Sequence, residues 1–87
     1  MATVFIPALL RKLTGGRESI VASGRTVGQI IDQIEEQFPG FRLQVMEKGE
    51  LKPSIAVSID GELATGGLFD PVRESSEIHF IPAIGGG

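Results

Sequence analysis

The 87-residue sequence contains no cysteine, no tryptophan, no tyrosine and a single histidine. Without cysteine there can be no disulfide, thiolate metal site, iron–sulfur cluster or cysteine nucleophile. One histidine cannot form the clusters that bind transition metals, so we expect no metal site. The N-terminal stretch MATVFIPALLRKL lacks the basic start, long apolar run and small-residue cleavage site of a signal peptide. We therefore expect a cytoplasmic protein with no membrane partner.

Basic residues are also scarce, since eight Lys and Arg stand against eleven Asp and Glu, for a net charge of -3 and a pI near 5.0. This is the wrong sign for binding that depends on neutralising phosphates, so we expect no nucleic-acid partner. Hydrophobic residues make up 41% and charged residues 22% of the chain. Those proportions are typical of an ordinary globular domain, and the length predicts one domain with a modest core.

Two β-branched and aromatic runs, ATVFIP at 2–7 and ESIVAS at 18–23, predict an N-terminal hairpin. The intervening LRKLTGG contains the chain reversal, for which Gly15 and Gly16 supply positive-φ positions. A phosphate-binding loop is the alternative for this glycine pair. It is disfavoured because no Gly-Lys-Ser/Thr follows at the required spacing.

One helix is predicted after the hairpin, in TVGQIIDQIEEQFPG. An apolar stripe recurs there with helical spacing, at Val27, Ile30, Ile31, Ile34 and Phe38. Thr26 and Gln29 have the spacing of a capping box, and Pro39-Gly40 ends the helix. The opposite face carries Asp32, Glu35 and Glu36, which we interpret as a solvated surface rather than a carboxylate site.

The second half of the chain predicts two strands joined by loops. Residues 41–53 alternate at first but are then broken by Gly49, Lys52 and Pro53, which indicates an irregular crossing loop with room for a short helical turn. A strand is predicted at 54–60, and the sequence DGE at its end indicates a tight turn. The loop-rich stretch at 63–76 is expected to bury its apolar residues Leu68, Phe69 and Val72. The last strand, 77–84, places Ile78 and Phe80 on one face and His79 and Ile81 on the other.

The order of these elements is strand, strand, helix, loop, strand, loop, strand, which indicates the α+β class with one helix across a sheet. The predicted domain covers residues 1–84, and residues 85–87 form a flexible glycine tail.

This predicted domain offers no catalytic constellation. His79 stands alone on a strand and is interpreted as a surface or pairing residue. Asp60 and Glu62 flank Gly61 in an exposed turn and do not resemble a tuned acid–base pair. No nucleophile triad or dinucleotide fingerprint is present, so we predict that the protein is not an enzyme.

The chain instead ends in Gly85, Gly86 and Gly87. A disordered end or a cloning remnant would explain three glycines, but here they follow a predicted strand directly. From Pro82 onward the chain can reach roughly 20 Å when extended. Because glycine has no side chain, such a tail can enter a narrow channel of another protein. Its carboxylate could there be activated by adenylation with ATP.

Three segments, IPALLRKLTGG, SGRTVGQIIDQIEEQFPG and the terminal FIPAIGGG, resemble the MoaD/ThiS family of ubiquitin-like sulfur carriers across essentially the whole chain. Within that family the likeness is greatest to the carriers of cysteine biosynthesis. The resemblance implies a β-grasp fold with a mixed sheet. It also implies that Gly87 is adenylated and converted to a thiocarboxylate, with Gly86 completing the diglycine and Gly85 acting as an extra hinge.

The resemblance further implies two partner proteins: a ubiquitin-activator-like adenylating enzyme, which uses ATP, and a sulfur-accepting enzyme of cysteine-synthase-like or similar type. The carrier itself is expected to bind no cofactor. We expect Ile81 and Ile84, beside the tail, to form the partner-binding surface.

Other functions fit the same tail. A ubiquitin-like modifier would be conjugated to lysines through Gly87, a molybdopterin synthase small subunit would serve a pterin, and a plain binding subunit would not use the tail at all. The sequence leaves open the final sulfur acceptor, the oligomeric state and whether Gly87 is the encoded terminus or one exposed by processing.

Overall fold

The structure, a computed structural model, describes residues 1–82 and builds them around a five-stranded mixed sheet. The strands are β1 (Ala2–Phe5), β2 (Ser19–Ala22), β5 (Ile55–Ile59), β6 (Glu62–Leu63) and β7 (Glu77–Pro82). They lie in the order β2-β1-β7-β5-β6, and β1 pairs with β7 in parallel while the other neighbours are antiparallel. The predicted α+β class and mixed sheet are confirmed.

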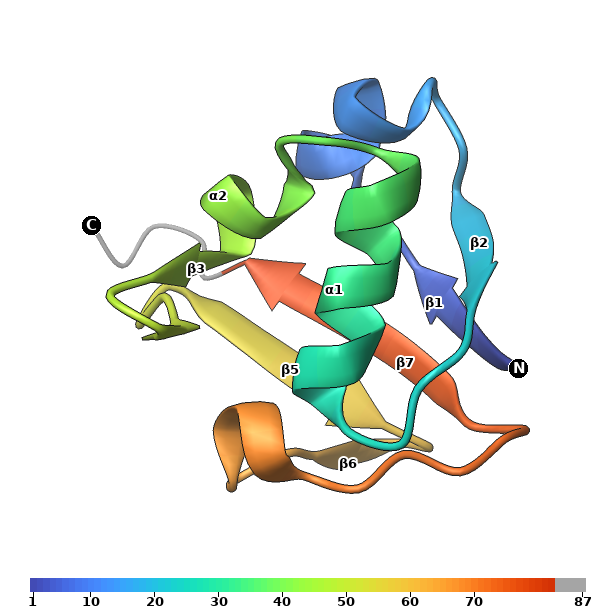
Figure 1. The fold of residues 1–87 in the computed structure, drawn as a ribbon, viewed down its shortest axis with the longest axis vertical. Coiled ribbons are helices and arrows are strands. Elements are labelled where there is room, and N and C mark those ends of the chain that lie inside the picture. The colour runs from blue at the N-terminus through green and yellow to red at the C-terminus, as the bar shows by residue number, and fades with distance from the viewer. Residues whose placement is uncertain (83–87) are drawn as a thin grey trace.

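One face of this sheet is covered by α1 (Val27–Gln37), which crosses in front of the strands in Figure 1. Residues of β1, β2, β5 and β7 that point to that face form the buried side of the sheet, because successive strand side chains point to opposite sides, whereas both residues of the short edge strand β6 are exposed. The predicted stripe on the helix is buried there too, apart from the half-buried Phe38. The core consists of Ala2, Val4, Ile6, Leu10, Ile20, Ala22, Val27, Ile30, Ile31, Ile34, Phe41, Val45, Val57, Val72, Ile78 and Phe80.

The predicted cap of α1 forms with one difference. The Thr26 hydroxyl accepts a hydrogen bond from the Gln29 N–H at 3.2 Å. The Gln29 side chain in turn accepts from the backbone N–H of Arg25 at 2.8 Å, one residue earlier than a standard capping box requires. Both bonds satisfy backbone donors at the start of the helix, so the sequence located this terminus correctly.

The connection between β1 and β2 is a 3-10 helix, η1 (Ala8–Thr14), with Pro7 at its N-cap. It ends at Gly15 and Gly16, whose φ angles of 67° and 87° confirm the positive-φ positions predicted there. The hydroxyl of the buried Thr14 donates within this turn, where the Arg11 and Arg17 carbonyls both lie at 3.1 Å. The buried Thr14 side chain therefore stabilises the turn.

Residues 41–53 are more regular than predicted. They form α2 (Phe41–Val45) and a small hairpin of β3 (Met46–Glu47) and β4 (Glu50–Leu51). Phe41 and Val45 are buried whereas Leu43 is 73% exposed, so the apolar spacing is helical rather than alternating. The Glu35 side chain accepts hydrogen bonds from the N–H groups of Gly40 and Arg42 at 3.1 and 2.8 Å, which supports the helix N-terminus.

The expectation that Phe69 lies in the core is wrong, because this side chain is 88% exposed. It belongs to a short 3-10 helix, η2 (Gly67–Phe69), in which neighbouring side chains point about 120° apart. Leu68 packs against the core and so turns Phe69 outward. Val72 is buried, as predicted.

The remaining strand predictions are confirmed for β5 and β7, including the inward Ile78 and Phe80 and the outward His79 and Ile81. Asp60 and Gly61, with φ of 51° and 88°, form the expected tight turn between β5 and β6. None of the helices between residues 1 and 82 has the length and apolar character needed to cross a membrane. The predicted domain end at residue 84 and the glycine tail at 85–87 lie outside the described residues.

The burial of α2 yields a prediction about stability. Phe41→Ala removes a fully buried ring and should lower the free energy of unfolding by about 3–5 kcal/mol. Leu43→Ala, on the exposed side of the same helix, should change it by no more than about 0.5 kcal/mol. Urea unfolding followed by circular dichroism measures both. Equal losses in the two variants would mean that residues 41–45 alternate as a strand does.

Candidate functional site

The last strand, β7, leads directly to the segment that sequence analysis selected as functional. It lies at the centre of the sheet, paired with β1 from Thr3↔Glu77 to Phe5↔His79 and with β5 from Ile59↔Ile78 to Ile55↔Pro82. On β7, the pairing with β1 therefore ends three residues before the pairing with β5. Ile81 and Pro82, which we call the tail root, extend past the end of β1.

The inner side of β7 is fixed by aromatic packing. The rings of Phe41 on α2 and Phe80 on β7 meet edge to face, with centroids 5.5 Å apart and planes at 82°. This arrangement is favourable beyond the area it buries. Phe41 of α2 therefore braces β7 at Phe80, just before the tail root, and α2 lies near this end of the strand in Figure 1.

The beginning of β7 is fixed by Asp60, whose carboxylate accepts from the Glu77 N–H and from the Ser76 hydroxyl, both at 2.9 Å. The Asp60 N–H also donates to the Glu77 carbonyl at 2.9 Å. These hydrogen bonds, that of Glu77 first, favour the ionised carboxylate and hold the pKa of Asp60 below its ordinary value. The sequence suggested only a turn residue here, because the contact joins positions that are distant in the chain.

The outer side of β7 belongs to the face of the sheet opposite α1. Ile81 is 44% exposed there and lies across from Ala56 of β5. His79 stacks on Phe5 of β1, with ring centroids 4.4 Å apart and planes within 9°. The prediction that His79 is a surface and pairing residue agrees with this position. Phe5, His79 and Ile81 thus form a semi-apolar surface that ends at the tail root.

A groove of about 310 Å³ runs beside the tail root. It is lined by Phe5, Ile6, Pro7, Arg11, Glu18, His79, Phe80, Ile81 and Pro82. Arg11 reaches it from η1 and donates from Nε to the Ile6 carbonyl at 2.9 Å. No sequence motif indicated a role for Arg11, which lies near Ile81 because β1 pairs in parallel with β7.

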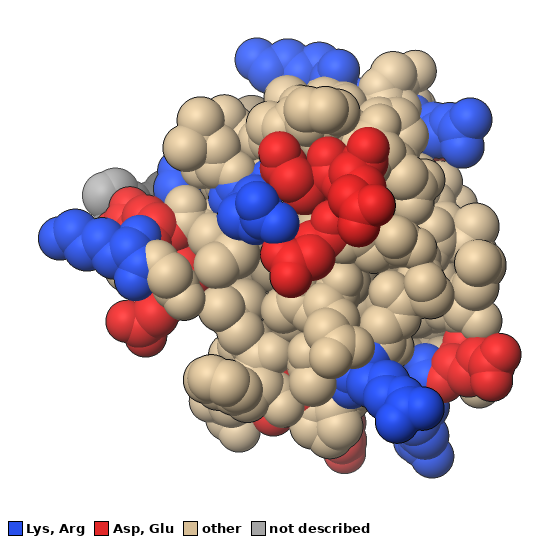
Figure 2. Space-filling view, viewed as in Figure 1, with Lys and Arg blue, Asp and Glu red and all other residues tan. Residues whose placement is uncertain are grey.

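The acidic face of α1 is the main cluster of charge visible in Figure 2, with a basic side chain beside it. Asp32 and Glu36 are exposed, and Asp32 forms an ion pair with Arg42. Glu35 accepts the two backbone bonds at the start of α2, those of Arg42 and then Gly40, and these lower its pKa. The predicted solvated surface is correct for Asp32 and Glu36, whereas Glu35 supports the fold.

Within residues 1–82, no three His, Asp or Glu side chains are placed to hold a metal ion. Of the predicted site residues, only Ile81 lies within residues 1–82. It is exposed, as expected, on the face of the sheet opposite α1. Ile84, Gly85, Gly86 and Gly87 lie outside the described residues. What the structure provides is therefore a braced strand end with an apolar surface and a groove around it.

Comparisons with known proteins agree with this architecture. The model of the ThiS family matches residues 4–87. A sulfur carrier protein of Mycobacterium tuberculosis, CysO, is 32% identical over 98% of this chain and 97% of its own. A chain in the crystal structure of the BexX/CysO complex of Amycolatopsis orientalis superposes with a TM-score of 0.95, at 35% identity and full coverage of both chains. The small archaeal modifier protein 1 of Methanosarcina acetivorans superposes with a TM-score of 0.85 at 26% identity, covering 99% of this chain and 95% of that one.

The Asp60 contacts predict a dependence of stability on pH. Because the folded pKa is lowered, the contribution of the carboxylate is present above its unfolded pKa of about 3.9 and is lost as pH falls through the folded value. Asp60→Asn should be less stable than the parent at pH 7, and the difference should shrink below about pH 4. Denaturant unfolding from pH 7 to pH 2.5 measures it.

The matched control is Glu62→Gln in the same turn, because the Glu62 side chain makes no hydrogen bond to residues 1–82. This substitution should leave the pH profile of the parent unchanged. A stability difference for Asp60→Asn that stays constant with pH would contradict the assigned role of the carboxylate.

Proposed function

This chain belongs to the ThiS family, and we propose that it is a sulfur carrier protein for the biosynthesis of cysteine or a related sulfur metabolite. The observation that carries the proposal is the near full-length identity of 32% with the sulfur carrier CysO. The chain then acts as a protein co-substrate of other enzymes rather than as an enzyme. The reacting group is the carboxylate of Gly87.

The chemistry requires only that carboxylate from the carrier. One of its oxygens attacks the α-phosphorus of ATP, pyrophosphate leaves, and the tail becomes an acyl-adenylate. Sulfide then attacks the acyl carbon, the C–O bond to AMP breaks, AMP leaves, and a thiocarboxylate results. ATP is bound by the partner enzyme, so the carrier needs no cofactor of its own. Glycines at 85, 86 and 87 suit passage into a channel because they carry no side chains.

Two partners follow from this chemistry: an adenylating enzyme related to ubiquitin activators and a sulfur-accepting enzyme, cysteine-synthase-like or similar. Support comes from the Amycolatopsis neighbour, which was crystallised in a complex with BexX. Both partners must receive the tail and therefore cover the tail root. Ile81, exposed on the open face, and Ile84, which follows it in sequence, are our candidates for the contact.

The direct test supplies the cognate adenylating enzyme, ATP, magnesium and a sulfide source. The intact protein should exchange one oxygen for one sulfur at Gly87, detected by mass spectrometry of the C-terminal peptide. A thiol-specific alkylating reagent should then label the product once, and no cysteine is present to mimic this result. A chain lacking Gly86 and Gly87 is the control and should stay unmodified. Full function of the shortened chain would favour a plain binding subunit.

A protein modifier is the second candidate, favoured by the likeness to small archaeal modifier protein 1. The same acyl-adenylate would then be transferred to lysines of other proteins. Extracts probed with an antibody against this chain would show conjugates of higher mass. Lysine-linked adducts without an alkylatable C-terminus in the test above would replace the sulfur-carrier proposal with this one.

The proposed contact at Ile81 predicts a separation of binding from stability. Ile81→Ala should raise the KM of the adenylating enzyme for the carrier by about tenfold or more, because truncating an interface anchor costs roughly 2 kcal/mol. The melting temperature should barely change, since the side chain is 44% exposed. Val21 is an exposed aliphatic residue on the edge strand β2, which β1 separates from β7, and Val21→Ala should behave like the parent. A large fall in melting temperature with unchanged KM would make Ile81 a structural residue.

A further inference from the structure

The groove beside the tail root combines apolar walls with one fixed cation. Aromatic, aliphatic and proline side chains from β1, β7 and the turn after β1 form most of its lining. Arg11 and Glu18 are its charged members, and His79 lies at its edge, stacked on Phe5. The groove adjoins Ile81 and Pro82, so a protein that receives the tail would lie over it.

Arg11 is held in a defined position and forms no ion pair with residues 1–82. Its Nε donates to the Ile6 carbonyl at 2.9 Å, and its side chain is partly buried. Ion pairs within residues 1–82 join Arg42 to Asp32 and the N-terminus to Glu74, and none involves Arg11. The outer nitrogens of its guanidinium make no hydrogen bond to residues 1–82. A guanidinium oriented in this way is suited to bidentate pairing with a carboxylate.

We propose that this groove docks the adenylating enzyme, with Arg11 pairing to an acidic side chain of that enzyme beside the tail root. The inference rests on the proposed function, because it presumes that Gly87 is adenylated. Arg11 would be a positioning residue, since it touches the partner and not the reacting atoms.

The adenylation step is the one that most needs such a contact. It brings a tail carboxylate towards the anionic phosphates of ATP, and like charges repel. Contacts with parts of the carrier remote from the reaction supply binding energy that helps to offset this repulsion. The carrier has a net charge of -3, so an oriented cation at the tail root adds attraction where the overall charge supplies none.

Glu18 gives the proposal a second, opposite consequence. Its carboxylate lines the same groove and would repel an incoming acidic side chain, although it lies beyond ion-pair distance of Arg11. Glu18→Gln should therefore lower the KM for the carrier, whereas removing the Arg11 charge should raise it. A merely structural role for Arg11 would produce no such opposition.

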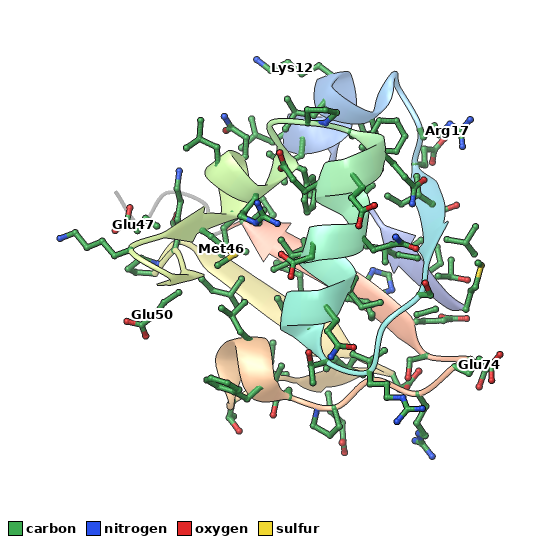
Figure 3. All side chains as sticks on the ribbon, in the orientation of Figure 1. Lys12, Arg17, Met46, Glu47, Glu50 and Glu74 are labelled. Atoms are coloured by element: carbon green, nitrogen blue, oxygen red, sulfur yellow. The ribbon has the colours of Figure 1, made fainter. Side chains whose placement is uncertain are left out.

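The test compares initial rates of adenylation by the cognate enzyme. Arg11→Gln should raise the KM for the carrier by about tenfold or more, with kcat unchanged. Arg17→Gln is the matched control and should stay within about twofold of the parent. Figure 3 shows Arg17 and Lys12 extending away from the body of the domain. Added salt should raise the KM of the parent more steeply than that of Arg11→Gln.

Arg11→Gln also removes the bond to Ile6, so its melting temperature is measured alongside. If Arg11→Gln is unfolded at the assay temperature, the KM of Glu18→Gln provides the test instead. A KM for Glu18→Gln that is equal to or higher than that of the parent would overturn the proposal. Equal KM values for folded Arg11→Gln and Arg17→Gln would overturn it as well. A parent chain that is never adenylated would instead refute the proposed function itself.

Discussion

The parallel pairing of β1 with β7 is the interaction on which the rest of this structure depends. It joins the first and last strands of the described chain and places them at the centre of the sheet. Through it His79 stacks on Phe5, and Arg11 is carried from the N-terminal connection to the side of Ile81. The surface around the tail root is therefore assembled from both ends of the chain.

This arrangement separates recognition from chemistry. Phe41 and Asp60 fix the inner face and the start of β7, so the tail root has a defined position on a folded platform. The chemistry we propose needs only the carboxylate of Gly87 from this chain, and the proposal assigns the catalytic groups to the partner enzymes. A carrier of this design can be small, since its domain has only to be recognised and to present its end. The exposed Ile81 and the groove beside it suit that task better than any small-molecule pocket would.

Local sequence signals predicted the elements whose residues interact with near neighbours. The spacing from Val27 to Ile34 determined α1, the Thr26 cap marked its start, and Asp60-Gly61 marked the turn after β5. Prediction failed where tertiary contacts choose between conformations. Phe41, Leu43 and Val45 fit a strand as well as a helix until Glu35 supports the helix start and Phe41 meets Phe80. Phe69 was expected inside because it is apolar, but Leu68 takes the inward position in a short 3-10 helix.

The sequence by itself determined the class of fold, the single long helix, the strand that precedes the tail and the terminal glycines, because periodicity, caps and chain order are local properties. It also indicated the family through three segments and their order. Only the tertiary structure decided that Asp60 holds the start of β7, that His79 stacks on Phe5, and that Arg11 lines a groove with Ile81. Each of these contacts joins residues far apart in the chain, and the register of a mixed sheet brings them together through hydrogen bonds that no local pattern encodes.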